Sequence, residues 1–289
     1  MSDPDNVPFA EVIGDPIMHS KSPLIHGFWI KRLGLDVRYG ARRVTRETLA
    51  DYIDTSRANP NWLGCNITMP LKEAVIPLID HLEPVAKAIG AVNTVYRGAD
   101  GKLVGTNTDA GGFLEPLESL LEEKHLFRMA RIVGNGGAAR AIVAALTQHG
   151  FTIVLASRNV GKARSLLAEL APDGEHYTAP LAHFAEATDF EFDDREGCLD
   201  LIINASPLGM EGNPPLLFNW SHAPPGSIAY DIVTSPSDTL FLHSAQTAGF
   251  QTIAGLEMLV GQAAIAFEKF FGVAPPRSFD DRLKEMLRE

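Results

Sequence analysis

The sequence predicts an α/β fold organised as two domains. Short apolar runs typical of strands alternate with stretches whose apolar residues recur at helical spacing, which is the pattern of layered α/β proteins. A glycine-rich turn near residue 134 stands between an apolar run and an alanine-rich helical stretch. The length of 289 residues favours two domains, with one large domain as the alternative.

The first half of the chain is predicted to contain strands, helices and one hairpin. Ser22 can cap a helix over Pro23–Leu33, because serine caps helices and proline suits the first helical position. The segment Gly98–Gly101 predicts the turn of a hairpin. The expected strands are Phe9–Gly14, Val37–Val44, Trp62–Thr68, Val92–Tyr96 and Lys102–Thr106, and further helices are expected over Thr45–Ala58, from about Leu71 and from about Asp109.

The second half repeats the alternation of strand and helix. The expected strands are Arg131–Gly134, Thr152–Ser157, Leu201–Ala205 and Ser227–Val233, and the expected helices are Gly137–His149, Val160–Leu170 and Gly255–Phe271. Residues 182–200 are acidic and weakly periodic, so we expect surface helix and loop there. In the last helix Gln262 points into the apolar stripe, where a polar side chain needs a partner, which could be a ligand.

The composition excludes several classes of protein. The formal net charge is −11, so general electrostatic binding to nucleic acid or to an anionic membrane is not expected. Cys65 and Cys198 are the only cysteines, and their separation gives neither a disulfide framework nor a metal site. The start of the chain lacks a signal-peptide pattern, and no apolar run is long enough to span a membrane. We expect a cytoplasmic protein in a reducing compartment.

The glycine-rich turn has the pattern of a dinucleotide-binding loop. Gly134, Gly136 and Ala139 fit G-x-G-x-x-A between a predicted strand and a predicted helix. The first glycine allows a tight turn, the second lets the backbone approach a pyrophosphate, and the small third residue lets the helix pack on the strand. The phosphates would bind at the helix N-terminus. The alternative is a tight turn with no ligand.

The next predicted strand ends in the residues that distinguish the two nicotinamide cofactors. An NAD enzyme usually carries an acid about twenty residues after the glycine loop, whereas an arginine suits the 2′-phosphate of NADP. This chain has Arg158 there, and Lys162 is close enough in sequence to add a second positive charge. The alternative for Arg158 is a solvated charge at a helix start. The sequence favours NADP.

Polar residues that follow predicted strands in the first half are candidate ligands of a second molecule. Ser20 and Ser22 can both donate hydrogen bonds to a carboxylate at a helix N-terminus, although Ser22 alone is equally well explained as a cap. Lys72 is expected in the first turn of a helix, where the helix dipole disfavours a cation, although most lysines are solvated. Asp109 can cap its helix, and Asn93 can serve a turn.

Seven segments stand in an order that is typical of a known family. They resemble the motifs of shikimate dehydrogenases and together cover roughly residues 7–272. The segments are G-D-P-I-M-H-S-K-S-P-L-I-H from Gly14, N-I-T-M-P-L-K from Asn66, A-V-N-T from Ala91, G-T-N-T-D-A-G-G from Gly105, G-N-G-G-A-A-R from Gly134, N-A-S-P-L-G-M from Asn204 and G-L-E-M-L-V-G-Q-A from Gly255. Each is weak evidence by itself, whereas seven in order are specific.

The resemblance implies a domain division and a set of functional residues. Residues 1–109 with 253–289 would form the substrate-binding domain, residues 110–252 a Rossmann NADP-binding domain, and the active site would occupy the cleft. Lys72 and Asp109 would be the catalytic pair, and Ser20 and Ser22 would bind the substrate carboxylate. Substrate hydroxyls would be bound by Thr68, Asn93, Asp109 and Gln262. NADP would be held by Gly134, Asn135, Gly136, Gly137, Ala138, Ser157, Arg158, Asn159, Lys162, Ile232 and Gly255, and no metal is implied.

The implied activity is the NADPH-dependent, reversible reduction of 3-dehydroshikimate to shikimate, a step of chorismate and aromatic amino acid biosynthesis, by a monomer or homodimer. The sequence departs from the family pattern at Thr234, where a tyrosine that contacts substrate is common, and at Asn135, where alanine is usual. Relatives that act on quinate or aminoshikimate with NAD or NADP therefore stay open. A non-catalytic relative is a second alternative, and its expected mark would be loss of Lys72 or Asp109. An unrelated Rossmann dehydrogenase is a third, and it would lack the features at Ser20, Ser22 and Gln262.

Overall fold

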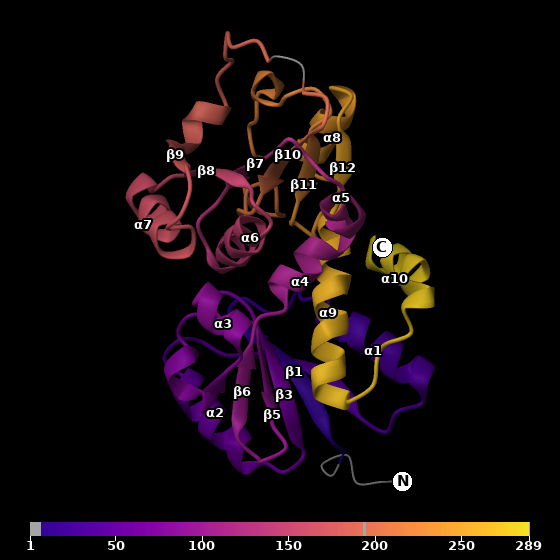
Figure 1. Cartoon of the computed structure of the whole chain (residues 1–289). Helices are drawn as coiled ribbons and strands as arrows, with labels where there is room; N and C mark the ends of the chain where they lie inside the picture. Colours follow the sequence, from indigo (N-terminus) through magenta and orange to yellow (C-terminus); the bar gives the residue numbers. More distant parts are fainter. Residues whose placement is uncertain (1–6, 193–194, 289) are drawn as a thin grey trace. The chain divides into compact units, whose positions relative to one another are not determined.

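The computed structural model describes residues 7–192 and 195–288, and it divides into two compact units. The first unit comprises Met1–Gly112 and Val260–Glu289, and the second comprises Phe113–Leu259. The chain passes from one unit to the other inside α4 (Asp109–Leu114) and again inside α9 (Gly255–Phe271), which Figure 1 shows as a single long helix. The two-unit α/β prediction is confirmed.

A mixed sheet of six strands forms the centre of the first unit, in the order β2-β1-β3-β5-β6-β4. Its strands are β1 (Phe9–Gly14), β2 (Arg38–Arg43), β3 (Trp62–Ile67), β4 (His81–Leu82), β5 (Thr94–Arg97) and β6 (Leu103–Thr106). β1 pairs in parallel with β2 and β3, and β5 pairs antiparallel with β3 and β6. The predicted hairpin is thereby confirmed, and β2 is a largely exposed edge strand.

Helices cover both faces of this sheet. Ile13 of β1 packs with Leu49 and Ile53 of α2 (Leu49–Ala58), whereas Ala10 packs with Ala266 and Phe270 of α9. These strand residues face opposite sides because side chains alternate along a strand. Figure 1 shows α2 on one side of the strands and α1 and α9 on the other. The remaining helices are α1 (Ser22–Leu33), α3 (Pro84–Ile89), α10 (Asp280–Arg288) and the 3₁₀ turns Ile76–Leu78 and Arg277–Phe279.

Two helix predictions in the first unit need correction. The helix expected from Leu71 is wrong: one α-turn closes from Val75 N to Leu71 O, and a 3₁₀ turn follows at Ile76–Leu78. Pro77 explains the stop, because proline lacks the N–H that a continuing helix needs. The helix expected over Thr45–Ala58 begins only at Leu49, because the four preceding residues form a turn instead.

The second unit is built on six parallel strands in the order β12-β11-β10-β7-β8-β9. The strands are β7 (Phe127–Val133), β8 (Thr152–Ser157), β9 (Tyr177–Pro180), β10 (Cys198–Asn204), β11 (Ile228–Asp231) and β12 (Gln251–Ile253). Numbered within the unit and read from the other edge, this is the 3-2-1-4-5-6 order of a Rossmann fold. The strand order reverses beside β7, which ends at the glycine loop.

Helices also cover both faces of the second sheet. Leu201 and Ile203 pack in the cluster with α6 (Gly137–Gln148) and α7 (Val160–Leu170), and Ile202 packs in the cluster with α8 (Leu240–Thr247). The other helical segments are α5 (Glu118–Glu122) and the 3₁₀ turns Glu115–Leu117, Leu181–Phe184 and Trp220–His222. Surface helix and loop were expected in residues 182–200. The regular structure in the described part of this range is the 3₁₀ turn Leu181–Phe184 and the start of β10. Residues 193–194 lie outside the description.

Candidate active site

Lys72 and Asp109 form an ion pair in the first unit. Lys72 lies in the turn after β3, Asp109 is the first residue of α4, and 2.5 Å separates Nζ from Oδ2. The Asp109 side chain is 2% exposed and that of Lys72 is 15% exposed. A carboxylate buried to this extent is strongly unfavourable unless it is paired and hydrogen-bonded. Lys72 is therefore not a solvated surface charge.

Asn93 joins this pair to Gln262. Its Nδ2 donates to Asp109 Oδ1 at 2.8 Å and to Gln262 Oε1 at 3.1 Å. Four predicted site residues from distant parts of the sequence are thus brought together. A partner was expected for the polar side chain of Gln262, and the Asn93 amide is such a partner. Asn93 therefore connects the residues of this site and is more than a turn residue.

Asp109 is not a helix cap. Both of its oxygens accept hydrogen bonds from side chains, and the Asp109 N–H donates to Oδ1 of Asn107 at 3.0 Å. Asn107 therefore satisfies the free backbone donor at this helix start. Asn107 was not among the site residues predicted from the sequence, although it stands inside the G-T-N-T-D segment.

Thr68 lies beside the end of β1. Its N–H donates to Ile13 O at 2.9 Å, and Asp15 N donates to Met69 O at 3.0 Å, so the segments after β1 and β3 run side by side. A Cβ at Gly14 would stand 2.4 Å from Thr68 Cγ2. Glycine at position 14 is therefore what lets these two segments approach.

The two predicted carboxylate ligands lie at the start of α1, and the predicted cap is wrong. Ser22 is already the first residue of the helix, and the preceding Lys21 makes no side-chain capping bond. The Ser22 N–H donates to Ser20 Oγ at 3.3 Å, so the serine that satisfies a free helix donor is Ser20. The ammonium of Lys21 donates to the carbonyl of Leu287 in α10, and burial lowers the pKa of Lys21.

The glycine loop of the second unit has the geometry that a dinucleotide requires. Gly134 has φ 124°, and a Cβ there would stand 2.5 Å from Ala205 O. Gly136 precedes α6, and a Cβ at Gly136 would meet no atom within 4 Å, so the backbone is open at the helix start. Free N–H groups at a helix N-terminus bind phosphates.

A second group of predicted cofactor residues follows β8. Asn135 Nδ2 donates to Ser157 Oγ at 3.2 Å, and Ser157 Oγ donates to Asn159 O at 2.8 Å, which ties this segment to the glycine loop. Asn159 Oδ1 accepts from Lys162 N at 2.9 Å and caps α7, so that oxygen is committed to the helix. Arg158 and Lys162 have exposed side chains.

The remaining predicted cofactor residues are Ile232, which follows β11, and Gly255, which is the first residue of α9. A Cβ at Gly255 would stand 2.4 Å from Val233 O, so glycine is required for the start of α9 to approach the segment that contains Ile232. Asp231, which the sequence analysis missed, is fully buried and accepts from Val233 N and from Thr239 Oγ1 at 2.7 Å. Its burial raises the pKa of the Asp231 carboxyl to about 6. Asp231 thereby fixes the segment after β11.

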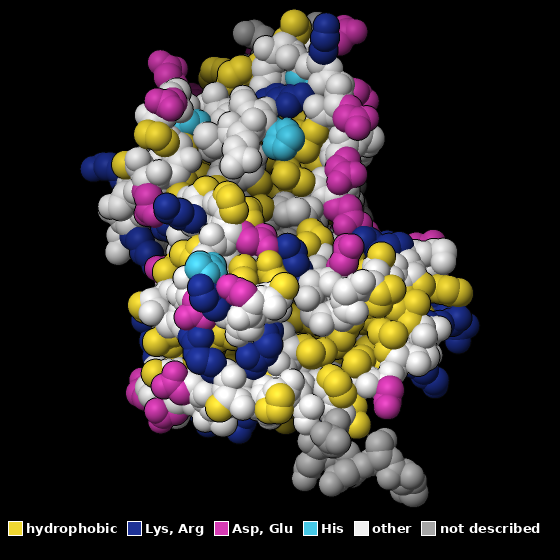
Figure 2. Space-filling model, turned by 60° about the horizontal axis from the view of Figure 1, so that its bottom comes forward, with side chains coloured by type: hydrophobic (Ala, Val, Ile, Leu, Met, Phe, Trp, Pro, Cys, Tyr) yellow, Lys and Arg dark blue, Asp and Glu magenta, His cyan; other side chains and the backbone are white. Residues whose placement is uncertain are grey.

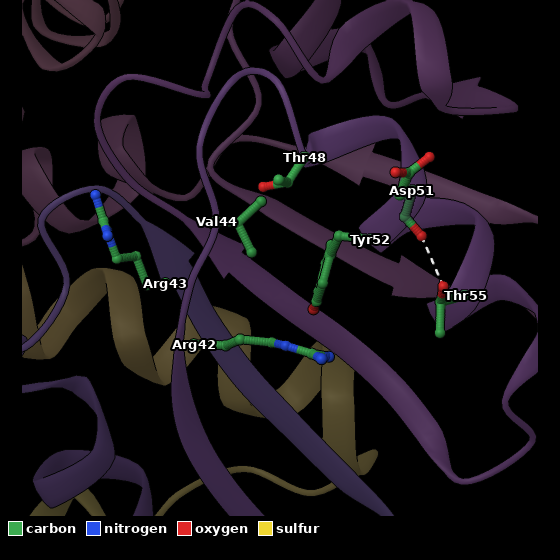
Figure 3. Close-up of a pocket in the computed structure, with 7 residues that line it drawn as sticks. All are labelled: Arg42, Arg43, Val44, Thr48, Asp51, Tyr52 and Thr55. Atoms are coloured by element: carbon green, nitrogen blue, oxygen red, sulfur yellow. Dashed lines mark hydrogen bonds between the residues drawn. The ribbon is translucent and has the colours of Figure 1, made fainter.

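The first unit also contains a pocket of about 320 Å³ (Figure 3). It is lined by Arg42, Arg43, Val44, Thr48, Asp51, Tyr52 and Thr55, none of which is a predicted site residue. Arg43 is paired with Asp15 at 2.8 Å, and the Arg42 guanidinium lies 5.6 Å from the centre of the Tyr52 ring. On the face drawn in Figure 2, basic side chains stand in small groups among acidic ones.

Two properties of the described residues bear on the class of protein. No three His, Cys, Asp or Glu side chains in residues 7–192 and 195–288 converge in a metal-binding arrangement. None of the helices in the same part of the chain is long and apolar enough to cross a membrane.

Comparisons with known proteins agree with one another. The sequence model of the shikimate dehydrogenase substrate binding domain matches residues 12–95, and that of the shikimate 5′-dehydrogenase C-terminal domain matches residues 255–279. The chain is 45% identical over 289 residues to the shikimate dehydrogenase (NADP⁺) of Sphingopyxis alaskensis, covering 99% of each protein.

Solved structures give the same result. The shikimate 5-dehydrogenase of Thermus thermophilus, in complex with NADP(H) and shikimate, superposes with a TM-score of 0.77 at 32% identity, over 97% of this chain and 99% of that one. The quinate dehydrogenase of Corynebacterium glutamicum, in complex with NAD, superposes with a TM-score of 0.80 at 27% identity, over 96% and 98%. From its motifs, its fold and its full-length identity to these relatives, the chain belongs to the shikimate dehydrogenase family.

Proposed function

We propose that this protein catalyses the reversible, NADPH-dependent reduction of 3-dehydroshikimate to shikimate, a step of chorismate and aromatic amino acid biosynthesis. The observation that carries the proposal is the buried Lys72–Asp109 pair, joined through Asn93 to Gln262. This cluster offers a proton donor and several hydrogen-bonding groups to a polyhydroxy acid. The expected mark of a non-catalytic relative, loss of Lys72 or Asp109, is absent from this chain.

The substrate is assigned to the first unit and the cofactor to the second, with residues 1–109 and 253–289 as the substrate-binding domain and residues 110–252 as the NADP-binding domain. Ser20 and Ser22 bind the substrate carboxylate, since their hydroxyls flank the start of α1. Thr68, Asn93 and Gln262 bind substrate hydroxyls. The protein works in the cytoplasm as a monomer or homodimer.

The residues of the second unit fit NADP. The positive φ of Gly134 and the open backbone at Gly136 allow a pyrophosphate to approach α6. The exposed guanidinium of Arg158, with Lys162 at the start of the next helix, suits the 2′-phosphate. Ile232 and Gly255, on segments that touch, line the place of the nicotinamide. When bound, the cofactor supplies or accepts the hydride.

Lys72 manages the proton of the reacting oxygen. Its ammonium polarises the substrate ketone and donates a proton as the alkoxide develops, and the neutral amine takes that proton back in the oxidising direction. The Asp109 carboxylate holds the Lys72 side chain in place. Asp109 therefore orients Lys72 and binds a substrate hydroxyl.

Thr234 supports a second candidate, a dehydrogenase that accepts quinate or aminoshikimate. Threonine is too short to make the contact of the tyrosine that is common at this position, and here it is half-buried. Without that contact, the site would discriminate less strictly between substrates that differ in their ring substituents. NAD in place of NADP belongs to the same alternative.

The test is steady-state turnover by the purified protein of shikimate, quinate and aminoshikimate, each with NADP⁺ and with NAD⁺. The proposal predicts the highest kcat/KM for shikimate with NADP⁺. A higher kcat/KM for quinate or aminoshikimate would establish the second candidate, and absence of turnover with all six pairs would overturn both.

A further inference from the structure

We propose that Tyr39, Asn66 and Thr94 are positioning residues, which hold Asn93 and through it Asp109 by a chain of hydrogen bonds that all point in one direction. None of the three has a place in the proton transfer or cofactor binding argued above. The inference deepens the proposed function and rests on it only where activity is measured.

The chain crosses one face of the first sheet. Tyr39 on β2 donates from its hydroxyl to Asn66 Oδ1 at 2.6 Å. Asn66 Nδ2 donates to Thr94 Oγ1 at 3.0 Å, and Thr94 Oγ1 donates to Asn93 Oδ1 at 2.9 Å. Asn93 Nδ2 then donates to Asp109 Oδ1 at 2.8 Å. Four consecutive bonds therefore connect an edge strand to the catalytic pair.

The packing of the sheet explains how Tyr39 reaches Asn66 over the intervening strand. β1 lies between β2 and β3, and its residue in register with Tyr39 is Ala10. The Tyr39 side chain packs against Ala10, whose methyl group leaves room for the ring to pass. Asn66 pairs with Val12, two residues along β1 and so on the same face, and also pairs with Thr94.

The direction of the chain is fixed at its inner end. Asn93 Oδ1 accepts from the backbone N–H of Thr108 at 2.8 Å, a group that can only donate. Asn93 Nδ2 faces a carboxylate oxygen, which accepts. The Asn93 amide has therefore one favourable orientation, because the flipped amide would set its oxygen against the Asp109 carboxylate.

The orientation of the Asn93 amide also determines which group donates and which accepts in the bonds farther from Asp109. Thr94 must donate to Asn93 Oδ1, so its lone pairs face Asn66 and Asn66 must present Nδ2. Asn66 Oδ1 then needs a donor, and Tyr39 supplies it. Each donor in such a chain is polarised by the bond behind it, which strengthens the last bond, the one to Asp109.

The outer end of the chain is held firmly. The Tyr39 ring stacks on His26 with 3.9 Å between centroids and 2° between planes. Burial raises the pKa of Tyr39 well above its ordinary value, so the phenol keeps the proton that it donates, although a hydrogen bond with Ser22 acts in the opposite direction. Stacking and protonation together make Tyr39 a fixed donor.

Two variants remove single hydroxyls from the chain and two matched controls remove hydroxyls outside it. The test variants are Tyr39→Phe and Thr94→Val. The controls are Tyr52→Phe, whose hydroxyl donates to Glu11 Oε1 at 2.9 Å, and Thr106→Val, whose hydroxyl donates to Glu83 Oε2 at 2.8 Å. Tyr52 and Thr106 are buried in the same unit and have no bond to Asn93 or Asp109 through those hydroxyls. Kinetics and thermal unfolding are measured on the same preparations of full-length protein.

We expect kcat to fall about 3- to 10-fold in Tyr39→Phe and in Thr94→Val, with KM for NADP⁺ unchanged and with kcat near wild type in both controls. The double variant should lose no more than Thr94→Val alone, because removal of Thr94 already disconnects Tyr39. Losses that multiply, or test variants whose kcat stays within about 2-fold of wild type, would overturn the proposal. Equal losses of kcat in the controls would do so as well, since they would indicate general destabilisation.

A measurement without substrate separates this inference from the proposed function. Hydrogen exchange of the Asn93 side-chain amide, followed by NMR, should accelerate in Thr94→Val and Tyr39→Phe relative to Thr106→Val and Tyr52→Phe. Unchanged exchange would contradict the chain, whatever the enzyme's substrate. If the wild-type protein does not turn over shikimate, only the proposed function is contradicted. The kinetics of the variants would then be measured with whichever polyol the protein oxidises.

Discussion

The Lys72 ammonium lies 2.5 Å from Oδ2 of Asp109, across 37 residues of sequence and with the carboxylate almost fully buried. Asp109 accepts from Asn93 through its other oxygen, so a protein donor holds each oxygen of the carboxylate. Its contribution is to hold the Lys72 side chain in place. The ion pair is accordingly the structural centre of the proposed chemistry.

The two serines at the start of α1 should be separable by kinetics and unfolding. If they bind the substrate carboxylate, Ser20→Ala and Ser22→Ala each raise KM for shikimate, by about 10-fold or more, because hydrogen bonds to charged groups are strong. Ser20→Ala should also lower the free energy of unfolding by about 1 kcal/mol, since Ser20 Oγ accepts from the Ser22 N–H. Ser22→Ala removes no capping bond.

Steady-state kinetics and urea unfolding on the same preparations check this pair of variants. Normal KM values in both would mean that the carboxylate binds elsewhere. If Ser20→Ala raises KM but leaves the free energy of unfolding unchanged, Ser20 contacts the substrate, and its hydrogen bond with Ser22 does not stabilise the fold.

Arg158→Ala should weaken NADP⁺ far more than NAD⁺, because only NADP⁺ carries the 2′-phosphate. The loss expected for a charge-assisted contact is about 1.5–3 kcal/mol, or roughly 10- to 150-fold in Kd. Dissociation constants of both cofactors measured by fluorescence titration give the ratio. Arg164→Ala is the matched control, an exposed arginine on α7 one turn further on. Equal weakening of the two cofactors would show that Arg158 does not contact the phosphate.

His26 makes the protein sensitive to acid. It is fully buried, neither ring nitrogen has a hydrogen-bond partner within the described residues, and desolvation lowers its pKa from 6.5 to about 3. The unfolded chain therefore binds a proton between these two values that the folded protein does not, so stability is lost as the pH falls below about 6.5.

Replacing His26 by Phe should remove this dependence while keeping the stack on Tyr39. Between pH 6.5 and about pH 5 the wild type should lose about 1.6 kcal/mol more of its free energy of unfolding than His26→Phe, because the unfolded His26 passes from half to almost full protonation over this range. Urea unfolding at the two pH values gives the difference. The same replacement at the exposed His243 is the control. Parallel losses in wild type and His26→Phe would show that His26 is protonated in the folded state.

Most of the second unit was predictable from sequence, because buried parallel strands carry continuous apolar runs. The residues of β10 and β11 form such runs, and the predicted bounds of α7 and α9 are those observed. β9 and β12 were missed because they are short, half-exposed edge strands without a distinct pattern. Helix ends were less predictable: Pro77 stopped the helix expected from Leu71, and the cap of α1 was misplaced.

The site was predictable to the extent that it coincides with motifs. Lys72, Asn93, Asp109 and Gln262 stand in quoted segments, and the structure brings them together. Asn66 and Thr94 stood in such segments without an assigned role. Tyr39 gave no signal, since it lies on a mostly exposed strand and its role depends on reaching Asn66 across β1. Contacts between strands that are distant in sequence are not encoded in local patterns.

The most direct test of the account is the rate at which the purified protein consumes NADPH in the presence of 3-dehydroshikimate, compared between wild type and Lys72→Met. The account predicts rapid consumption by wild type and a kcat lower by about 10²–10⁴ in Lys72→Met, the usual contribution of a general acid, with an unchanged Kd for NADPH. Consumption by Lys72→Met at the wild-type rate, or none by wild type, would contradict it.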